Sequence, residues 1–187
     1  MDFLSPEEFR VQETRRLTQI ADGALFIYPT DTIYGIGCDA TNQIAVMKIR
    51  ELKQRPDNPF SIIAPNKAWI PQHCHLTPLA TEWLAKLPGP YTLILEKHRD
   101  AVAPAVTAKP TLGIRIPNHW IAEIAEKLGK PIVTTSVNIS GQESLTDLQQ
   151  LPQSFKTTLA FAIDEGPLRG MPSRVIDVSS DEVRVLR

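Results

Sequence analysis

Residues 24–37 read ALFIYPTDTIYGIG and give the first indication of the fold. The apolar run at 24–28 lies between Gly23 and Pro29, which is typical of a buried strand. The turn that follows combines hydroxyl groups, a carboxylate and two glycines, so it is suited to a close approach to a ligand. The same residue types would also fit a plain strand-to-helix loop, in which Thr and Asp side chains bond their own backbone.

Helices and strands are expected to alternate on both sides of this stretch. Ser5, Pro6 and Glu8 form a capping box that begins a helix, and Gly129 is suited to end one. The alternation, with a strand-rich tail, predicts an α/β protein whose twisted sheet mixes parallel and antiparallel pairs and is flanked by helices. Helices are predicted at 5–21, 43–53, 77–87 and 118–128, and strands at 24–28, 60–64, 91–96, 112–116, 131–135, 159–163, 175–178 and 183–186.

Three helices carry more detailed expectations. The helix at 43–53 places Ile44, Met47 and Leu52 on one apolar face. Thr77, followed by a proline, is expected to begin the third helix, and Asn118 is a candidate N-cap for the fourth.

Length and composition set the class of protein. A chain of 187 residues suits one domain, here residues 1–187, and its 42% hydrophobic and 22% charged residues are ordinary for a globular protein. The apolar runs are too short to cross a bilayer, and Met1–Arg10 has no secretory apolar segment, so a cytoplasmic protein is expected. The net charge of −1 gives no global attraction for a polyanion, so any nucleotide or RNA binding would need a local basic pocket.

The cysteines do not indicate a disulfide framework or a metal site. Cys38 and Cys74 are the only two in the chain, and both are expected to be free thiols. His73, Cys74 and His75 are adjacent, but three neighbouring side chains in a loop diverge and do not make a tetrahedral zinc site. No protein-bound metal is therefore expected.

The segment 53–59, KQRPDNP, lies at the end of a predicted helix. Basic side chains at this end complement the helix dipole, which is one explanation for Lys53 and Arg55. The other is that a stiff loop projects two positive charges toward an anion. No Gly-rich phosphate loop is present, so phosphate binding here would depend on side chains.

Two further segments carry polar residues at the ends of predicted strands. Arg115 lies among apolar neighbours, and a buried Arg needs a carboxylate from the protein or from a ligand. Residues 134–141, TTSVNISG, leave a strand with many hydroxyl and amide groups. Strand ends of α/β sheets are favoured ligand positions, although a plain Ser/Asn turn would use the same residues.

Together these segments resemble the YrdC-like threonylcarbamoyl-AMP synthase family over nearly the whole chain. Each motif alone is short, but six occur in the family's order and spacing. They are the turn at 28–37, Lys53-x-Arg55-Pro56, the 88–92 segment PGPYT, Arg115-Ile116-Pro117, Ser136-x-Asn138 with Ser140-Gly141, and residues 166–177.

The resemblance implies a YrdC-like fold whose concave, basic cavity holds ATP and L-threonine side by side. It implies a nucleotidyltransferase that uses bicarbonate, with Mg²⁺ carried by ATP, and supplies a separate threonylcarbamoyl transferase of tRNA modification. Lys53 and Arg55 would carry the electrostatic part of catalysis. The implied ATP ligands are Lys53, Arg55, Asn58, Ser136, Asn138, Ser144 and Arg187, and the implied threonine ligands are Thr32, Arg115, Thr134 and Ser173.

The chain departs from the family pattern in three places. Many members carry a His a few residues after the Asn-Pro of the 53–59 loop, whereas residues 59–64 here read PFSIIA. The loop is also one residue shorter than the commonest form, and Ser173-Arg174 replaces the usual Ser-Thr. The missing His bears on the threonine pocket, and the shorter loop bears on the assignment of Asn58.

Two alternatives to the synthase follow from these observations. A YciO-like paralogue would share the fold but act poorly in this reaction. A double-stranded RNA-binding module would bind through the basic concavity, with affinity that falls steeply with salt. The chain has no basic excess and no aromatic stacking set, which argues against RNA binding as its main activity.

Overall fold

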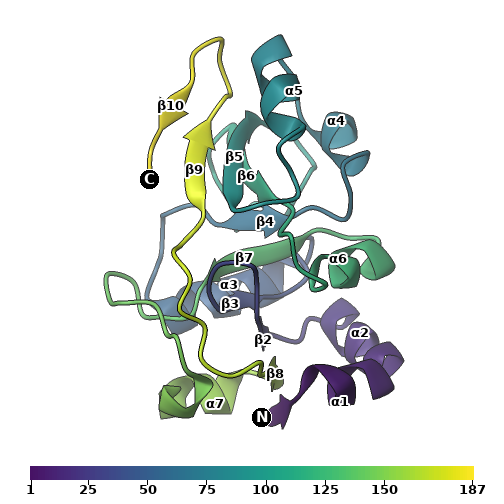
Figure 1. The fold of residues 1–187 in the computed structure, drawn as a ribbon, viewed down its shortest axis with the longest axis vertical. Helices are drawn as coiled ribbons and strands as arrows, with labels where there is room; N and C mark the ends of the chain where they lie inside the picture. Colours follow the sequence, from purple (N-terminus) through teal and green to yellow (C-terminus); the bar gives the residue numbers. More distant parts are fainter.

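The computed structural model describes residues 1–187, and its ten strands form one mixed sheet (Figure 1). Four neighbouring pairs, β1–β8, β2–β8, β4–β6 and β5–β9, are parallel and the others are antiparallel, as the alternating sequence pattern predicted. In order across the sheet, the strands are β1 (Asp2–Leu4), β8 (Phe161–Ile163), β2 (Phe26–Tyr28), β3 (Gly35–Gly37), β7 (Ile132–Ser136), β4 (Ser61–Ile63), β6 (Thr111–Arg115), β5 (Tyr91–Glu96), β9 (Arg174–Asp177) and β10 (Arg184–Val185).

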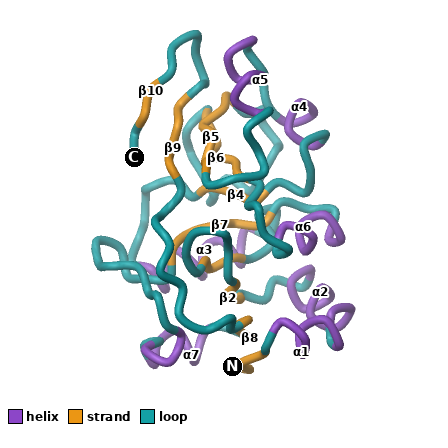
Figure 2. The backbone as a smooth tube through the Cα atoms, viewed as in Figure 1, coloured by secondary structure: helices purple, strands orange, loops and turns teal.

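Helices flank this sheet (Figure 2). They cover two separate apolar cores. The smaller core packs Phe9 and Ile20, from the first two helices, against Phe26 and Phe161 of the sheet. The larger core includes Val46 and residues of the other helices. The helices are α1 (Pro6–Val11), α2 (Glu13–Ala21), α3 (Gln43–Lys53), α4 (Trp69–His73), α5 (Pro78–Leu84), α6 (Ala122–Leu128) and α7 (Gln153–Thr158), with a 3₁₀ turn at Leu148–Gln150. None of them is both long and apolar enough to span a membrane.

Helix starts and ends follow the predicted caps, with two differences. Ser5 forms the capping box and Thr77 caps α5, as predicted. The predicted helix at 5–21 is divided at Gln12 into α1 and α2. Asn118 is not the N-cap of α6: its N–H donates to the carboxylate of Asp31 at 3.0 Å, and the helix begins four residues later.

The predicted apolar face of α3 is wrong for Ile44 and Met47, whereas Leu52 packs, partly buried, against the larger core and the bounds of the helix are confirmed. Ile44 is 71% exposed and Met47 is 42% exposed. The buried face contains Ile49, Arg50 and Lys53 instead. Because two long cations share the inner face, an apolar count along the sequence selects the wrong side of the helix.

The 24–37 stretch is a hairpin, so the strand-to-helix interpretation of its turn is wrong. Phe26, Ile27 and Tyr28 of β2 pair antiparallel with β3. The ring of Tyr28 lies over both β3 glycines, and its hydroxyl donates to the carbonyl of Val133 at 3.0 Å. The missing side chains of Gly35 and Gly37 therefore make room for a buried Tyr that links the hairpin to β7.

Substituting Gly37 tests this packing. A Cβ at Gly37 would lie 2.5 Å from the carbonyl oxygen of Val133 and 2.7 Å from the Tyr28 ring. We expect Gly37→Ala to lower the free energy of unfolding by about 1–3 kcal/mol, since backbone and a buried ring must both shift. Urea denaturation measures it, with Gly129→Asn, at a φ of 66° with open space around it, as a mild control. An unchanged midpoint for Gly37→Ala would contradict the packing.

Candidate functional site

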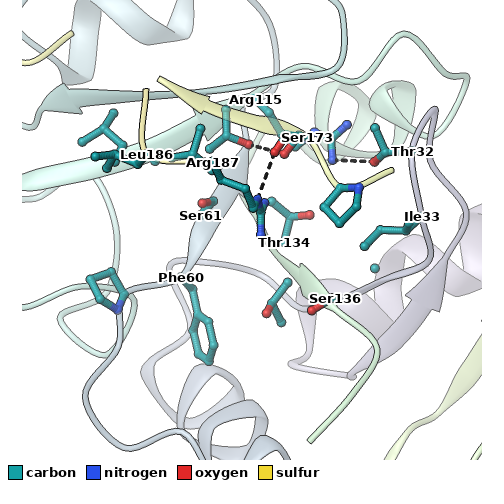
Figure 3. Close-up of a pocket in the computed structure, with 18 of the residues that line it drawn as sticks. Thr32, Ile33, Phe60, Ser61, Arg115, Thr134, Ser136, Ser173, Leu186 and Arg187 are labelled. Carbon is teal, nitrogen blue, oxygen red and sulfur yellow. Dashed lines mark hydrogen bonds between the residues drawn. The ribbon is translucent and has the colours of Figure 1, made fainter. Parts of the chain in front are cut away.

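A cavity of about 400 Å³ lies along the sheet, within the size range of small-molecule sites. Its walls come from the turn between β2 and β3, the ends of β6 and β7, the segment before β9, and the C-terminal residues (Figure 3). The charged residues that line it are Arg55, Lys109, Arg115, Arg187 and Asp177. Four cations and one carboxylate favour an anionic ligand.

Arg115, at the end of β6, is 5% exposed and forms an ion pair with Asp31. Its NH2 donates to Asp31 Oδ1 at 2.5 Å and its NH1 donates to Thr32 Oγ1 at 3.2 Å, whereas Nε has no partner. Burial lowers the pKa of Arg115 and the Asp31 carboxylate opposes that effect. The protein thus uses two of five guanidinium donors, which leaves capacity for an anion.

The turn that carries Thr32 is organised by Thr30, which the sequence had not singled out. Thr30 Oγ1 donates to Ile33 O at 2.8 Å and accepts from the Thr32 N–H at 3.1 Å. The two hydroxyls are 2.9 Å apart, and both residues line the cavity. This is the local side-chain-to-backbone bonding expected of Thr in a turn, and it fixes Thr32 beside Arg115.

Ser173 lines the cavity from the segment before β9. Its hydroxyl lies 2.8 Å from Thr92 Oγ1, and its carbonyl accepts from Arg187 Nε at 3.2 Å (Figure 3). Thr92 was quoted in a family motif but not assigned to the site, although it is buried and lines the cavity. The signal that could have identified Thr92 was a hydroxyl side chain at the second position of a predicted buried strand. Thr134, on β7, lines the same space.

Residues 164–170 cross over the β2–β3 turn and hold it from outside. Tyr34 OH donates to Gly166 O at 2.7 Å and accepts from the Glu165 N–H at 3.0 Å. A Cβ at Gly170 would overlap the carbonyl of Thr32, so only Gly allows this close approach. Gly170, like Thr30 and Thr92, was not assigned to the site by the sequence interpretation.

Arg55, Ser136 and Ser144 line another part of the cavity wall. The Arg55 guanidinium is held by its own loop: NH2 donates to Pro59 O at 2.6 Å, and Nε donates to Asn58 O at 3.3 Å. Burial, together with nearby Arg50, lowers the pKa of Arg55. A cation fixed in this way is preorganised for an anion.

Lys53, Asn58 and Asn138 do not line the cavity. Lys53 is 1% exposed, and its Nζ donates to Ser136 O at 2.5 Å, to Asn138 O at 2.7 Å and to Asn138 Oδ1 at 3.0 Å. Burial, together with Arg55, lowers the pKa of Lys53 to about 7. Asn58 is exposed, and its carbonyl accepts from Arg50 and Arg55. Lys53 therefore lies beneath the loop that carries Ser136.

The structure thus brings most of the predicted site residues to one space. They come from separate segments of the chain, both strands and loops, which the fold brings together. Those that line the cavity are Thr32, Arg55, Arg115, Thr134, Ser136, Ser144, Ser173 and Arg187.

No group of three or more His, Cys, Asp or Glu side chains is placed to hold a metal ion. Cys38 and Cys74 are free and buried. Burial raises the pKa of Cys74 to about 12, so its thiol stays protonated at neutral pH.

Comparison with known proteins gives one consistent family. The Sua5/YciO/YrdC family, described as "Telomere recombination", matches residues 18–187. A protein of Methanocaldococcus jannaschii, named as a putative threonylcarbamoyl-AMP synthase, is 37% identical over 172 residues, which cover 90% of this chain and 81% of that protein.

Solved structures agree with this match. Pyrococcus abyssi Sua5 in complex with L-threonine has a TM-score of 0.88 and 32% identity, and the match covers all of this chain but 56% of that one. E. coli YciO has a TM-score of 0.85 and 26% identity, covering 100% of this chain and 92% of its own. The chain thus spans a little over half the length of the Sua5 chain and nearly all of YciO.

Proposed function

The chain belongs to the Sua5/YciO/YrdC family, and from this premise we propose that it is an L-threonylcarbamoyladenylate synthase. It forms threonylcarbamoyl-AMP and pyrophosphate from L-threonine, bicarbonate and ATP. The observation that carries the proposal is the single cavity with Arg115 and Thr32 in one part of its wall and Arg55 and Ser136 in another. Two anionic groups, a carboxylate and a phosphate, can be held there at once.

L-Threonine is placed by the first of these parts. The Arg115 guanidinium pairs with the substrate carboxylate, while Thr32, Thr134 and Ser173 offer hydroxyls for its polar groups. The Sua5 structure solved with L-threonine supports this substrate for a relative at 32% identity. The Asp31 carboxylate holds the guanidinium in position before the substrate arrives.

ATP is placed by the second part. Arg55 and Arg187 carry guanidinium groups, whose geometry suits phosphate, and Ser136 and Ser144 supply hydroxyl donors. Mg²⁺ enters with ATP as part of the substrate. Lys53 and Asn138 act on this site through their contacts with each other and with Ser136. Asn58 acts through its backbone carbonyl, which accepts from Arg50 and Arg55.

The reaction requires no covalent enzyme nucleophile. The threonine amine attacks CO₂ and loses a proton, or attacks bicarbonate with loss of water, to give a carbamate. A carbamate oxygen then attacks the α-phosphate of ATP and expels pyrophosphate. Catalysis then depends on reactants held in line and on cations facing the developing phosphate charge. Well-oriented reactants alone can contribute about 7–11 kcal/mol. The product is consumed by a separate transferase that modifies tRNA.

Pyrophosphate release by the purified chain tests the proposal. With Mg-ATP and bicarbonate, release is expected only when L-threonine is present, and not with L-serine at the same level. The product, detected by mass spectrometry, should be threonylcarbamoyl-AMP. Arg55→Ala should lower turnover about tenfold or more, because one charge-assisted contact is lost.

Other outcomes of this assay identify the alternatives. Folded protein that binds ATP but releases no threonine-dependent pyrophosphate would contradict the synthase and favour a YciO-like activity, a fold shared at a TM-score of 0.85. Binding to duplex RNA that falls steeply with salt, without any effect of threonine, would favour the RNA-binding alternative.

A further inference from the structure

Arg50, near the end of α3, is a buried cation that makes its contacts with backbone carbonyls. It is 8% exposed, and its NH1 donates to Arg55 O at 2.8 Å, to Pro56 O at 2.8 Å and to Asn58 O at 3.2 Å. Its Nε donates to Ala105 O at 2.7 Å. One guanidinium thus connects the helix, the 55–58 loop and the chain at 105.

These contacts fix the loop that carries Arg55. The Arg55 side chain does not meet a carboxylate: it donates to Asn58 O and Pro59 O of its own loop. Both guanidinium groups lie over the ring of Phe60, at 4.7 Å for Arg50 and 5.1 Å for Arg55. The two guanidinium groups share the Asn58 carbonyl as an acceptor, so the direction of Arg55 depends on a loop conformation that Arg50 holds.

Burial of the Arg50 guanidinium lowers the stability of the fold unless its contacts provide a compensating gain. Burial lowers its pKa and Asp57 only partly opposes this, and no salt bridge accompanies it. An apolar side chain would be the simpler solution on the buried face of a helix. The gain lies in the shape of the 55–58 loop, because a planar fork can hold several carbonyls in a fixed arrangement.

We infer that Arg50 is a positioning residue for the nucleotide site, which acts by holding the 55–58 loop so that Arg55 faces the cavity. The inference rests on the proposed role of Arg55 in binding ATP. It assigns to Arg50 an effect on ATP that a purely structural residue would not have, and no effect on L-threonine.

The test measures the Kd of Mg-ATP and of L-threonine by calorimetry for the wild type, Arg50→Met and Arg50→Lys. Arg50→Met should raise the Kd of ATP about tenfold or more and leave that of threonine within about twofold. The Kd of ATP for Arg50→Lys should lie between those of the wild type and Arg50→Met, because an ammonium cannot reach three carbonyls in one plane. In an Arg55→Ala background, Arg50→Met should cause no further loss of affinity for ATP.

Arg16→Met is the matched control. Arg16 is 2% exposed, donates to Asp2, Gln12 and Gln19, and is not among the residues that line the cavity. Its loss should lower the melting temperature without changing the Kd of ATP. An unchanged Kd for Arg50→Met, an equal loss in Arg16→Met, or losses that add to those of Arg55→Ala would each overturn the inference. Because binding is measured directly, a wild type that binds ATP yet makes no product would contradict the proposed synthase activity without contradicting the role of Arg50.

Discussion

Arg115→Gln is expected to lower kcat/KM for L-threonine about 100-fold or more, with a much smaller change in KM for ATP. Two charge-assisted hydrogen bonds to the substrate carboxylate are lost, each contributing about 1.5–3 kcal/mol. Gln keeps most of the side-chain volume at a position that is 5% exposed, so packing changes little. Initial rates of pyrophosphate release against threonine concentration measure the effect.

Asp31 complicates this variant and also supplies its control. With Arg115 gone, a carboxylate that is 12% exposed loses its ion-pair partner, which lowers stability. Arg115→Gln combined with Asp31→Asn should therefore recover the melting temperature but not the activity. Arg174→Gln, an exposed arginine beside Ser173, should keep both. If Arg115→Gln alone retained the wild-type KM for threonine, this result would contradict the assignment of Arg115.

Sequence patterns located most of the helices and strands, because burial of one face gives the apolar residues of each element a regular spacing. The strand at 91–96 and the helix at 43–53 have the predicted bounds. β3 was missed, because a three-residue strand with two glycines, Gly35 and Gly37, has only one residue of the type that marks a strand. Its identity as a strand is set by Tyr28 packing on the glycines, which is a tertiary contact.

The site was harder to predict than the fold, because side-chain direction is not encoded by residue type. Arg55 lines the cavity, whereas Lys53, two residues before it, is covered. Both are cations at a helix end, and only the packing of the Ser136–Asn138 loop separates them. Thr92 and Gly170 were not assigned, since their importance lies in a partner distant in sequence: Ser173 for one, the Thr32 carbonyl for the other.

Lys53→Met is expected to lower the free energy of unfolding by about 1–3 kcal/mol. It removes three hydrogen bonds and leaves the backbone carbonyl of Asn138 without a donor, whereas Ser136 O still accepts from the Asn138 N–H and Asn138 Oδ1 still accepts from the Ser136 hydroxyl. Activity should fall at least as much as in Arg55→Ala, because the loop that carries Ser136 loses its support. Lys48→Met, at an exposed position of the same helix, is the control and should change neither property.

The pH dependence of stability tests the environment of Lys53 separately from its contacts. Burial lowers its pKa from 10.5 to about 7, so between these values the unfolded chain binds more protons at this position than the folded one. The free energy of unfolding should therefore rise with pH above 7, by up to about 1.4 kcal/mol per pH unit. Subtracting the urea-derived values of Lys53→Met from those of the wild type at pH 7, 7.75 and 8.5 isolates this contribution from the buried thiols. A flat difference would mean that the three acceptors keep the ammonium charged in the fold, and Lys53 would then hold the Ser136 loop equally well across this range.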